Sequence, residues 1–240
     1  MSPEIFLLCG TAATIAVVHT LAGPDHYLPF VALAKSRQWS LGTALRTTLV
    51  CGSGHIVGSV LLGFVGIYAS IQLNALEWLE GLRGDLAAWA LVSFGLVYMA
   101  WGLRRAYRKR PHAHWHSHGS SLHYHSHDHQ HEHNHAHSPD DTAENRRGVA
   151  GWAIFIVFVL GPCEPLIPIL MFPAAKESMA GLVAVTTVFA LVTVATMLFA
   201  VALSMWGLKS VRMPGLARYG EALAGGTITM CGLSIAVLGL

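Results

Sequence analysis

Six apolar segments, each long enough to cross a lipid bilayer, constrain the fold of this chain more than any other feature. A transmembrane helix needs roughly 20 apolar residues, and only structures that pair their own backbone groups cross lipid. The segments lie at about 4–23, 43–71, 85–105, 149–173, 179–207 and 217–239. Of the 240 residues, 53% are hydrophobic and 12% are charged, about half the charge of an ordinary soluble domain. We therefore predict an all-α polytopic membrane protein with six transmembrane helices.

A polar stretch between the third and fourth segments divides the chain into three parts. We expect a three-helix membrane repeat at 1–105, a histidine-rich loop at 106–147 and a second three-helix repeat at 148–240. Histidine alternates with other residues in the loop, but nothing apolar is there to bury, so we predict disorder. Histidine-rich tracts bind divalent metal ions at many weak sites. The loop contains His112, His114, His116, His118, His123, His125, His127, His129, His131, His133, His135 and His137.

Lysine and arginine are distributed unevenly, and this predicts the orientation of the chain. With the N-terminus outside, thirteen fall on the cytoplasmic side and only Arg83 and Lys176 fall outside. The thirteen are Lys35, Arg37, Arg46, Arg104, Arg105, Arg108, Lys109, Arg110, Arg146, Arg147, Lys209, Arg212 and Arg218. Cytoplasmic loops carry such an excess, and the first segment lacks the basic start of a signal peptide. We expect a bacterial inner-membrane protein with a retained first helix, both termini outside and the histidine-rich loop cytoplasmic.

A short sequence match relates the two halves. Residues 21–30 read Leu-Ala-Gly-Pro-Asp-His-Tyr-Leu-Pro-Phe, and residues 159–168 read Val-Leu-Gly-Pro-Cys-Glu-Pro-Leu-Ile-Pro. Three spans separate the copies, so the second enters the membrane from the opposite side. Proline lacks an N–H and disfavours helical angles in the residue before it. The match predicts a 3+3 inverted repeat with Pro-broken first and fourth helices, a transporter plan that holds substrate where the broken helices meet.

Three ionisable residues, His19, Asp25 and His26, occupy the first break. Ionisable groups at membrane depth are costly and mark functional sites. On an unbroken helix the two histidines would lie roughly 10 Å apart, too far to share one metal ion at bond lengths of about 2 Å. The Gly-Pro break lets the chain fold back, and imidazole with carboxylate suits nickel, cobalt or zinc. Alternatively, the polar residues cap the break by hydrogen bonding to freed carbonyl groups.

His55 is a candidate ligand in the second span. It lies mid-span in the sequence Cys-Gly-Ser-Gly-His-Ile-Val-Gly at 51–58. Gly54 and Gly58 allow another backbone to approach, so His55 should project at a close helix–helix contact, beside the first broken helix. It could bind metal there, or form an interhelical hydrogen bond that stabilises packing.

The second motif supplies two more candidates, Cys163 in place of Asp25 and Glu164 in place of His26. Glu164 could complete a metal coordination shell or carry a counter-proton, and we expect no lysine or arginine mid-span to pair with it. Cys163 could equally be a metal ligand or a small apolar filler.

These motifs together resemble the NicO/UreH-like nickel–cobalt transporter family. The resemblance is carried by His19-(x5)-Asp25-His26, the Gly-Ser-Gly-His55 segment, the Gly-Pro-Cys-Glu-Pro motif and the histidine-rich loop. Related permeases have His-(x4)-Asp-His and usually eight spans, so six spans and one more intervening residue favour the NicO/UreH-like branch. The resemblance implies gradient-driven transport of Ni²⁺ or Co²⁺, with Zn²⁺ as a further candidate. It implies no enzymatic activity, no prosthetic group and no nucleic-acid partner.

The loop favours efflux slightly over uptake, because it could collect cytosolic metal. It could instead buffer incoming metal for a metallochaperone or for urease or hydrogenase assembly proteins. A rival function is thiol–disulfide electron transport, since the second motif looks like that of the CcdA/DsbD proteins. Asp25 stands where the partner cysteine should be, however, and Cys9 lies about four turns away. A third alternative is a metal-binding accessory protein for urease or hydrogenase maturation.

Overall fold

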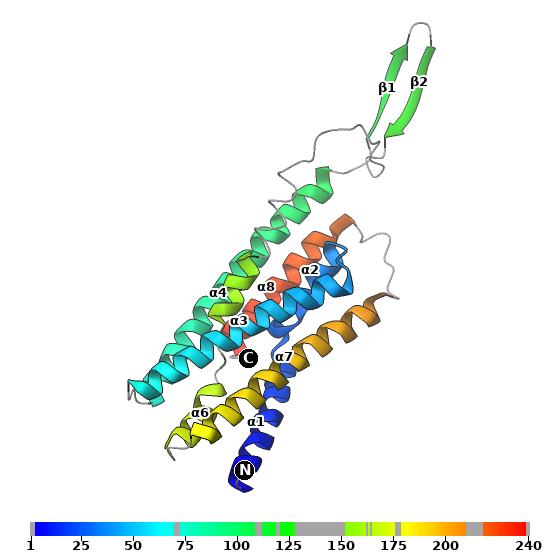
Figure 1. Cartoon of the computed structure of the whole chain (residues 1–240). Coiled ribbons are helices and arrows are strands. Elements are labelled where there is room, and N and C mark those ends of the chain that lie inside the picture. The colour runs from blue at the N-terminus through cyan, green and yellow to red at the C-terminus, as the bar shows by residue number, and fades with distance from the viewer. Residues whose placement is uncertain are drawn as a thin grey trace.

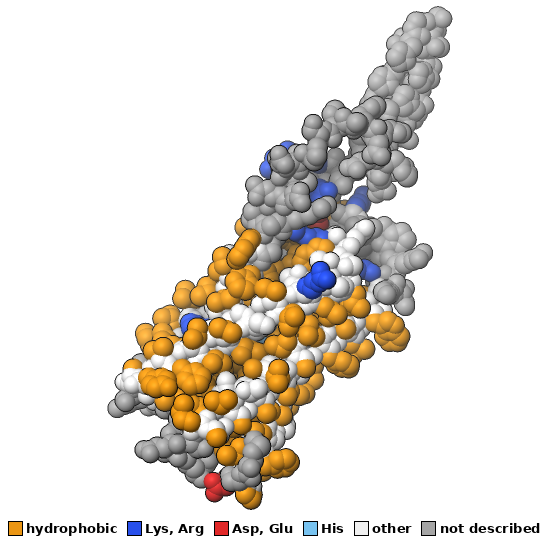
Figure 2. All heavy atoms as spheres, in the orientation of Figure 1, with side chains coloured by type: hydrophobic (Ala, Val, Ile, Leu, Met, Phe, Trp, Pro, Cys, Tyr) orange, Lys and Arg blue, Asp and Glu red, His pale blue; other side chains and the backbone are white. Residues whose placement is uncertain are grey.

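The computed structural model describes residues 3–69, 73–108, 112–118, 121–127, 152–161, 163, 165–175, 179–209 and 218–238. Five helices in these residues are long and apolar enough to cross a membrane. They are α1 (Pro3–Ala22), α3 (Leu41–Tyr68), α4 (Leu73–Arg108), α7 (Met179–Lys209) and α8 (Gly220–Leu238). Hydrophobic side chains cover much of the bundle face seen in Figure 2. The prediction of a helical membrane protein is confirmed at this level.

Both Gly-Pro motifs break their helices, as predicted. After α1, a short 3-10 helix η1 (Pro24–His26) leads into α2 (Leu28–Ser36). In the second half, a helix over 152–160 ends and α6 (Leu166–Ala175) follows. In each motif the helix ends one residue before the glycine, and the next helix begins five residues after it. The two breaks therefore coincide with the sequence match, position for position.

The helix α4 begins twelve residues before the predicted third span. Its first turns contain Glu80 and Arg83, which make this stretch look too polar for a membrane helix. In the structure Glu80 is buried, and its Oε1 lies 2.6 Å from Nη1 of Arg83. The pairing offsets the cost of placing either charge alone in the bundle. Arg83, expected in an outside loop, therefore lies inside a helix.

Helix packing joins the two halves of the chain. α8 packs along α4, and α7 packs along α1 and α3 (Figure 1). Backbones touch in the α4–α8 contact: a Cβ atom added to Gly95 would lie 2.5 Å from the Thr229 nitrogen, and one added to Gly232 would lie 2.8 Å from the Ala88 oxygen. Only glycine allows such an approach. The sequence analysis did not predict this contact.

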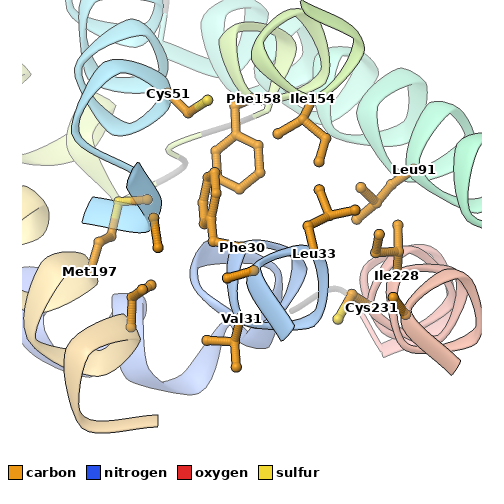
Figure 3. Close-up of a cluster of buried hydrophobic side chains, with 14 of the residues drawn as sticks. Phe30, Val31, Leu33, Cys51, Leu91, Ile154, Phe158, Met197, Ile228 and Cys231 are labelled. Carbon is orange, nitrogen blue, oxygen red and sulfur yellow. The ribbon is translucent and has the colours of Figure 1, made fainter. Parts of the chain in front are cut away.

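Two apolar clusters fill the bundle at different levels. The hairpin-side cluster, shown in Figure 3, brings together α2, α3, α4, α7, α8 and the helix over 152–160; its buried members include Phe30, Leu33, Cys51, Phe158, Met197, Val201 and Ile228. The N-terminal-side cluster lies among α1, α6 and α7; its buried members are Ala12, Ala16, Cys163, Leu166, Leu170, Leu182, Val185 and Phe189. On α7, the members of the two clusters are separated by the turn that carries Thr193.

The histidine-rich loop contains an antiparallel β-hairpin, which projects from one end of the bundle in Figure 1. Strand β1 (His112–His118) pairs with β2 (Ser121–His127), with His112 opposite His127 and His116 opposite His123. Disorder was predicted for this loop, whereas the structure describes these two stretches as paired strands, with which alternation at period two is compatible. The other loop histidines lie outside the described residues; they are His129, His131, His133, His135 and His137.

Most of the lysine and arginine side chains visible in Figure 2 gather at the end of the bundle that carries the hairpin. Cross-links between helices form there. Lys35 Nζ donates to the Leu208 carbonyl oxygen at 2.8 Å, and Arg105 pairs with Glu221. We call this the basic end. Lys176, one of the two residues expected on the other side, lies outside the described residues.

Candidate metal centre

The first helix break brings three histidine rings together. The ring centroids of His19 and His26 are 4.8 Å apart, and those of His26 and His55 are 5.3 Å apart. His19 lies at the end of α1, His26 in η1 and His55 in the middle of α3. The predicted fold-back at the break is confirmed, because an unbroken helix would separate His19 from His26 by about 10 Å.

The backbone and Asp25 hold the His26 ring in place. Its Nδ1 lies 3.1 Å from the Gly23 carbonyl oxygen and 3.2 Å from Asp25 Oδ1. Both are acceptors, so we assign the proton to Nδ1, and in the neutral imidazole Nε2 carries the lone pair. The ring therefore caps a carbonyl freed by the break, as the alternative interpretation expected, and also keeps a ligand atom. A carboxylate behind a histidine ligand is a common feature of metal sites, which suits Asp25 to orienting His26.

His55 is held by the broken helix of the second half. Its Nδ1 lies 3.2 Å from the Phe158 carbonyl oxygen, so the same reasoning leaves the lone pair on Nε2. A close helix–helix contact is present here, but it is made with the second broken helix: a Cβ atom added to Gly54 would lie 2.8 Å from a methyl carbon of Val159. The interhelical hydrogen bond and a ligand role are compatible here, because they use different nitrogen atoms. His55 thus connects the two breaks.

The Nε2 atoms of His19, His26 and His55 are buried and have no hydrogen-bond partner among the described residues. Buried polar atoms are nearly always paired with protein, water or an ion, so three together require an explanation. Within the described ranges, no three histidine, cysteine, aspartate or glutamate side chains are arranged as a complete metal-binding group. A cation would therefore have to draw the rings closer or recruit further ligands.

The two candidates from the second motif differ in outcome. Glu164 lies outside the described residues. Cys163 is fully buried in the N-terminal-side cluster, packed among apolar side chains such as Leu166. Its apolar neighbours are compatible with the predicted role of small filler, and the ligand role stays a prediction. All four cysteines are present as thiols.

Arg83 binds the second break, and the sequence analysis missed it. Its Nη2 donates to the carbonyl oxygens of Val159 at 3.0 Å and Gly161 at 3.2 Å, while Nη1 donates to Glu80. Side chains from the first half thus cap carbonyls freed at the break of the second half. The early start of α4 carries Arg83 into the bundle, where it binds these carbonyls; whether a basic residue pairs with Glu164 lies outside the described residues. The available signal was the i, i+3 spacing of Glu80 and Arg83, which suits an ion pair on a helix.

Comparison of the chain with models of known families, with curated proteins and with solved structures found no match. The function is therefore argued from the histidine cluster and its chemistry.

Proposed function

We propose that this chain transports divalent transition-metal cations, Ni²⁺ or Co²⁺, through the cluster of His19, His26 and His55. The observation that carries the proposal is the set of three buried imidazole Nε2 atoms that lack a partner among the described residues. Ionisable side chains at membrane depth mark ion pathways. The hydrogen bonds at Nδ1 leave Nε2 of His26 and His55 unprotonated in the neutral ring, and that is the form that binds metal.

The ligand chemistry favours borderline metal ions. Imidazole nitrogen suits Ni²⁺, Co²⁺ and Zn²⁺, whereas Mg²⁺ and Ca²⁺ take oxygen ligands. In the proposed cycle the cation exchanges water stepwise for imidazole, Asp25 orients His26, and Glu164 adds a carboxylate from the second half. The sequence given contains no phosphate-binding loop for ATP, so a gradient or a partner protein would drive the movement.

A 3+3 inverted repeat of the two halves supports alternating access. The two breaks fall at the same positions of the motif. The contacts between helices also recur when each helix is replaced by its equivalent in the other half. α1 packs on α7 as the helix over 152–160 packs on α3, and α2 packs on α8 as α6 packs on α4. The contacts α3–α7 and α4–α8 each join equivalent helices. Rocking of the halves about such an axis would expose the cluster to one side and then the other.

The proposed orientation places the basic end in the cytoplasm of a bacterium, with both termini outside the inner membrane. The histidine hairpin then meets cytosolic metal, which favours efflux slightly over uptake. For uptake, the same hairpin would hold incoming metal for a metallochaperone or for urease or hydrogenase assembly proteins.

Metal flux into proteoliposomes of known orientation tests the proposal. We expect radiolabelled Ni²⁺ or Co²⁺ to cross with the wild-type chain. His26→Ala should abolish flux and Asp25→Asn should weaken it, while Val18→Ala, at a lipid-exposed position of α1, should have no effect. Wild-type flux in both site variants would overturn the site, and absence of flux with the wild-type chain would overturn the function.

Two further variants separate the rival functions. Cys163→Ser should retain transport, whereas a thiol–electron transporter would lose its activity. A chain lacking residues 112–137 should still transport metal in proteoliposomes. In cells, the same deletion should lower metal tolerance if the protein exports metal, and should change metal uptake if it imports metal. An accessory protein that binds metal only through this loop would show no flux with or without it.

A further inference from the structure

We infer that Thr20, Ser59 and Thr193 extend the histidine cluster into a hydroxyl subsite that holds the water ligands of a partly hydrated divalent cation. The inference rests on the proposed transport function and adds three residues to the same site. Each of these side chains is 0% exposed, and its hydroxyl oxygen finds no hydrogen-bond partner in the described part of the chain.

Most threonine hydroxyls in the described spans bond to their own helix. Serine and threonine in membrane helices commonly donate to the carbonyl four residues earlier. Ten described residues do so at 2.7–3.0 Å, both buried and exposed; they are Thr11, Thr14, Thr47, Thr48, Thr186, Thr187, Thr196, Thr227, Thr229 and Ser234. Thr20, Ser59 and Thr193 show no such bond and are fully buried, where a missing partner is most costly. Their hydroxyls are therefore available to another partner in the interior.

Two of these hydroxyls adjoin the histidines along the chain. Thr20 follows His19 at the end of α1, immediately before the break. Ser59 lies four residues after His55, one turn along the same face of α3. The unpartnered hydroxyls of Thr20 and Ser59 thus lie on α1 and α3, each within one turn of a histidine whose Nε2 is also unpartnered.

Thr193 brings the third hydroxyl to this level from α7. It lies one turn after Phe189 of the N-terminal-side cluster and one turn before Met197 of the hairpin-side cluster. A Cβ atom added to Gly52 of α3 would lie 3.0 Å from Met197 Sδ, and α3 and α7 run in opposite directions (Figure 1). Thr193 lies one turn before Met197 on α7, and His55 lies about one turn after Gly52 on α3. Because the two helices are antiparallel, Thr193 and His55 are therefore at the same level.

The position of α1 also indicates the level of Thr193. α1 runs alongside α7 in the same direction in Figure 1. Ala16 and Phe189 are the last buried members of one cluster on their helices, so the next turn of each helix carries Thr20 and Thr193 beyond that cluster on the same side. Histidine rings and hydroxyls together form a polar layer between the two apolar clusters.

The chemistry of the layer fits a hydrated cation. A metal ion polarises its bound water, which makes that water a strong hydrogen-bond donor. A hydroxyl that is not otherwise engaged has two lone pairs to accept such a bond. Imidazoles would bind the metal on one side of the layer, and the hydroxyls would accept from the waters that remain on the other.

Isosteric variants of the full-length protein test the subsite. Thr193→Val and Ser59→Ala remove one hydroxyl each, and Thr193→Ser restores it. Thr48→Val is the matched control, because Thr48 is also 0% exposed on α3 but donates to the Ala44 carbonyl oxygen at 2.9 Å. The measurements are Ni²⁺ affinity by calorimetry and the thermal unfolding midpoint of the metal-free protein in detergent.

We expect Thr193→Val and Ser59→Ala to weaken Ni²⁺ affinity roughly tenfold, the effect of losing one hydrogen bond to a charged group. The unfolding midpoint of the metal-free protein should stay level or rise, because an unpaired buried hydroxyl is removed. Thr193→Ser should keep most of the affinity, and Thr48→Val all of it. A merely structural hydroxyl would instead lower the midpoint and leave affinity unchanged.

Wild-type affinity in Ser59→Ala and Thr193→Val, alongside loss of binding in His55→Ala, would overturn the subsite and leave the proposed function standing. Absence of Ni²⁺ or Co²⁺ flux with the wild-type chain in proteoliposomes would overturn the proposed function itself. If the valine variant does not fold, Ser59→Ala decides the question alone, since it deletes a single oxygen atom.

Discussion

The Arg83 guanidinium of α4 donates a hydrogen bond to the carbonyl oxygen of Gly161 at 3.2 Å. The two residues belong to different halves of the chain, and the bond caps the second helix break. Gly161 in turn lies against His55: a Cβ atom added to it would be 3.2 Å from His55 Nδ1. A charged side chain of the first half therefore fixes the backbone on which a candidate ligand rests.

Exchanging the charges of Glu80 and Arg83 separates two roles of this pair. The double variant Glu80→Arg/Arg83→Glu keeps an ion pair but turns a carboxylate toward the carbonyl oxygens of Val159 and Gly161. We expect a folded protein that loses most of its metal flux in proteoliposomes. Arg83→Ala alone should cost about 3–5 kcal/mol of stability, because Glu80 then loses its charge partner. Undiminished flux in the exchanged variant would show that only the charge balance matters.

Gly23→Ala should disable the metal site without unfolding the protein. A Cβ atom at this position would lie 2.6 Å from His26 Nδ1 and 2.8 Å from Asp25 Oδ1, so the imidazole must move. Ni²⁺ affinity should fall at least tenfold, as expected when the groups that orient a histidine ligand are displaced. Gly10→Ala, in α1 with no atom within 4 Å of the added carbon, is the control and should bind like wild type. Equal affinity in the two variants would argue against His26 as a ligand.

Metal binding should weaken as the pH falls. Imidazole binds a metal ion only when neutral, so each histidine of the cluster competes with a proton for its lone pair. Calorimetry on a chain lacking residues 112–137, which removes the loop histidines, should show affinity falling below neutral pH and proton release on binding. Affinity independent of pH between 5 and 8 would be inconsistent with histidine ligands.

The glycine contact between α4 and α8 should be intolerant of side chains. Gly95→Leu would drive carbon atoms into the backbone at Thr229, and overpacking of this kind costs about 3 kcal/mol or more. The thermal unfolding midpoint in detergent should drop sharply or the protein should fail to accumulate. Gly207→Ala on α7, which has nothing within 4 Å of the new carbon, should leave the midpoint unchanged. Similar midpoints for both variants would mean that the contact opens without cost.

Local chemistry made part of this structure predictable. The breaks at Gly23-Pro24 and Gly161-Pro162 follow from proline itself, and the meeting of His19 with His26 follows from the first break. Arg83 was missed because a hydropathy profile scores every charged residue as unfavourable in a membrane. The profile does not show that Glu80, one turn earlier on the same helix, pairs with Arg83. Thr20 and Thr193 were missed for a related reason. A hydroxyl in an apolar span looks the same in sequence whether it bonds to its own helix or not.

The two apolar clusters have an electrical consequence. They seal the polar layer from above and below at once, and a bare divalent ion could cross neither without losing its solvation, at a cost of many kcal/mol. In this conformation, an ion that left the polar layer in either direction would meet apolar side chains of the described residues. If the proposed transport holds, opening toward one side would have to part only one of the two clusters.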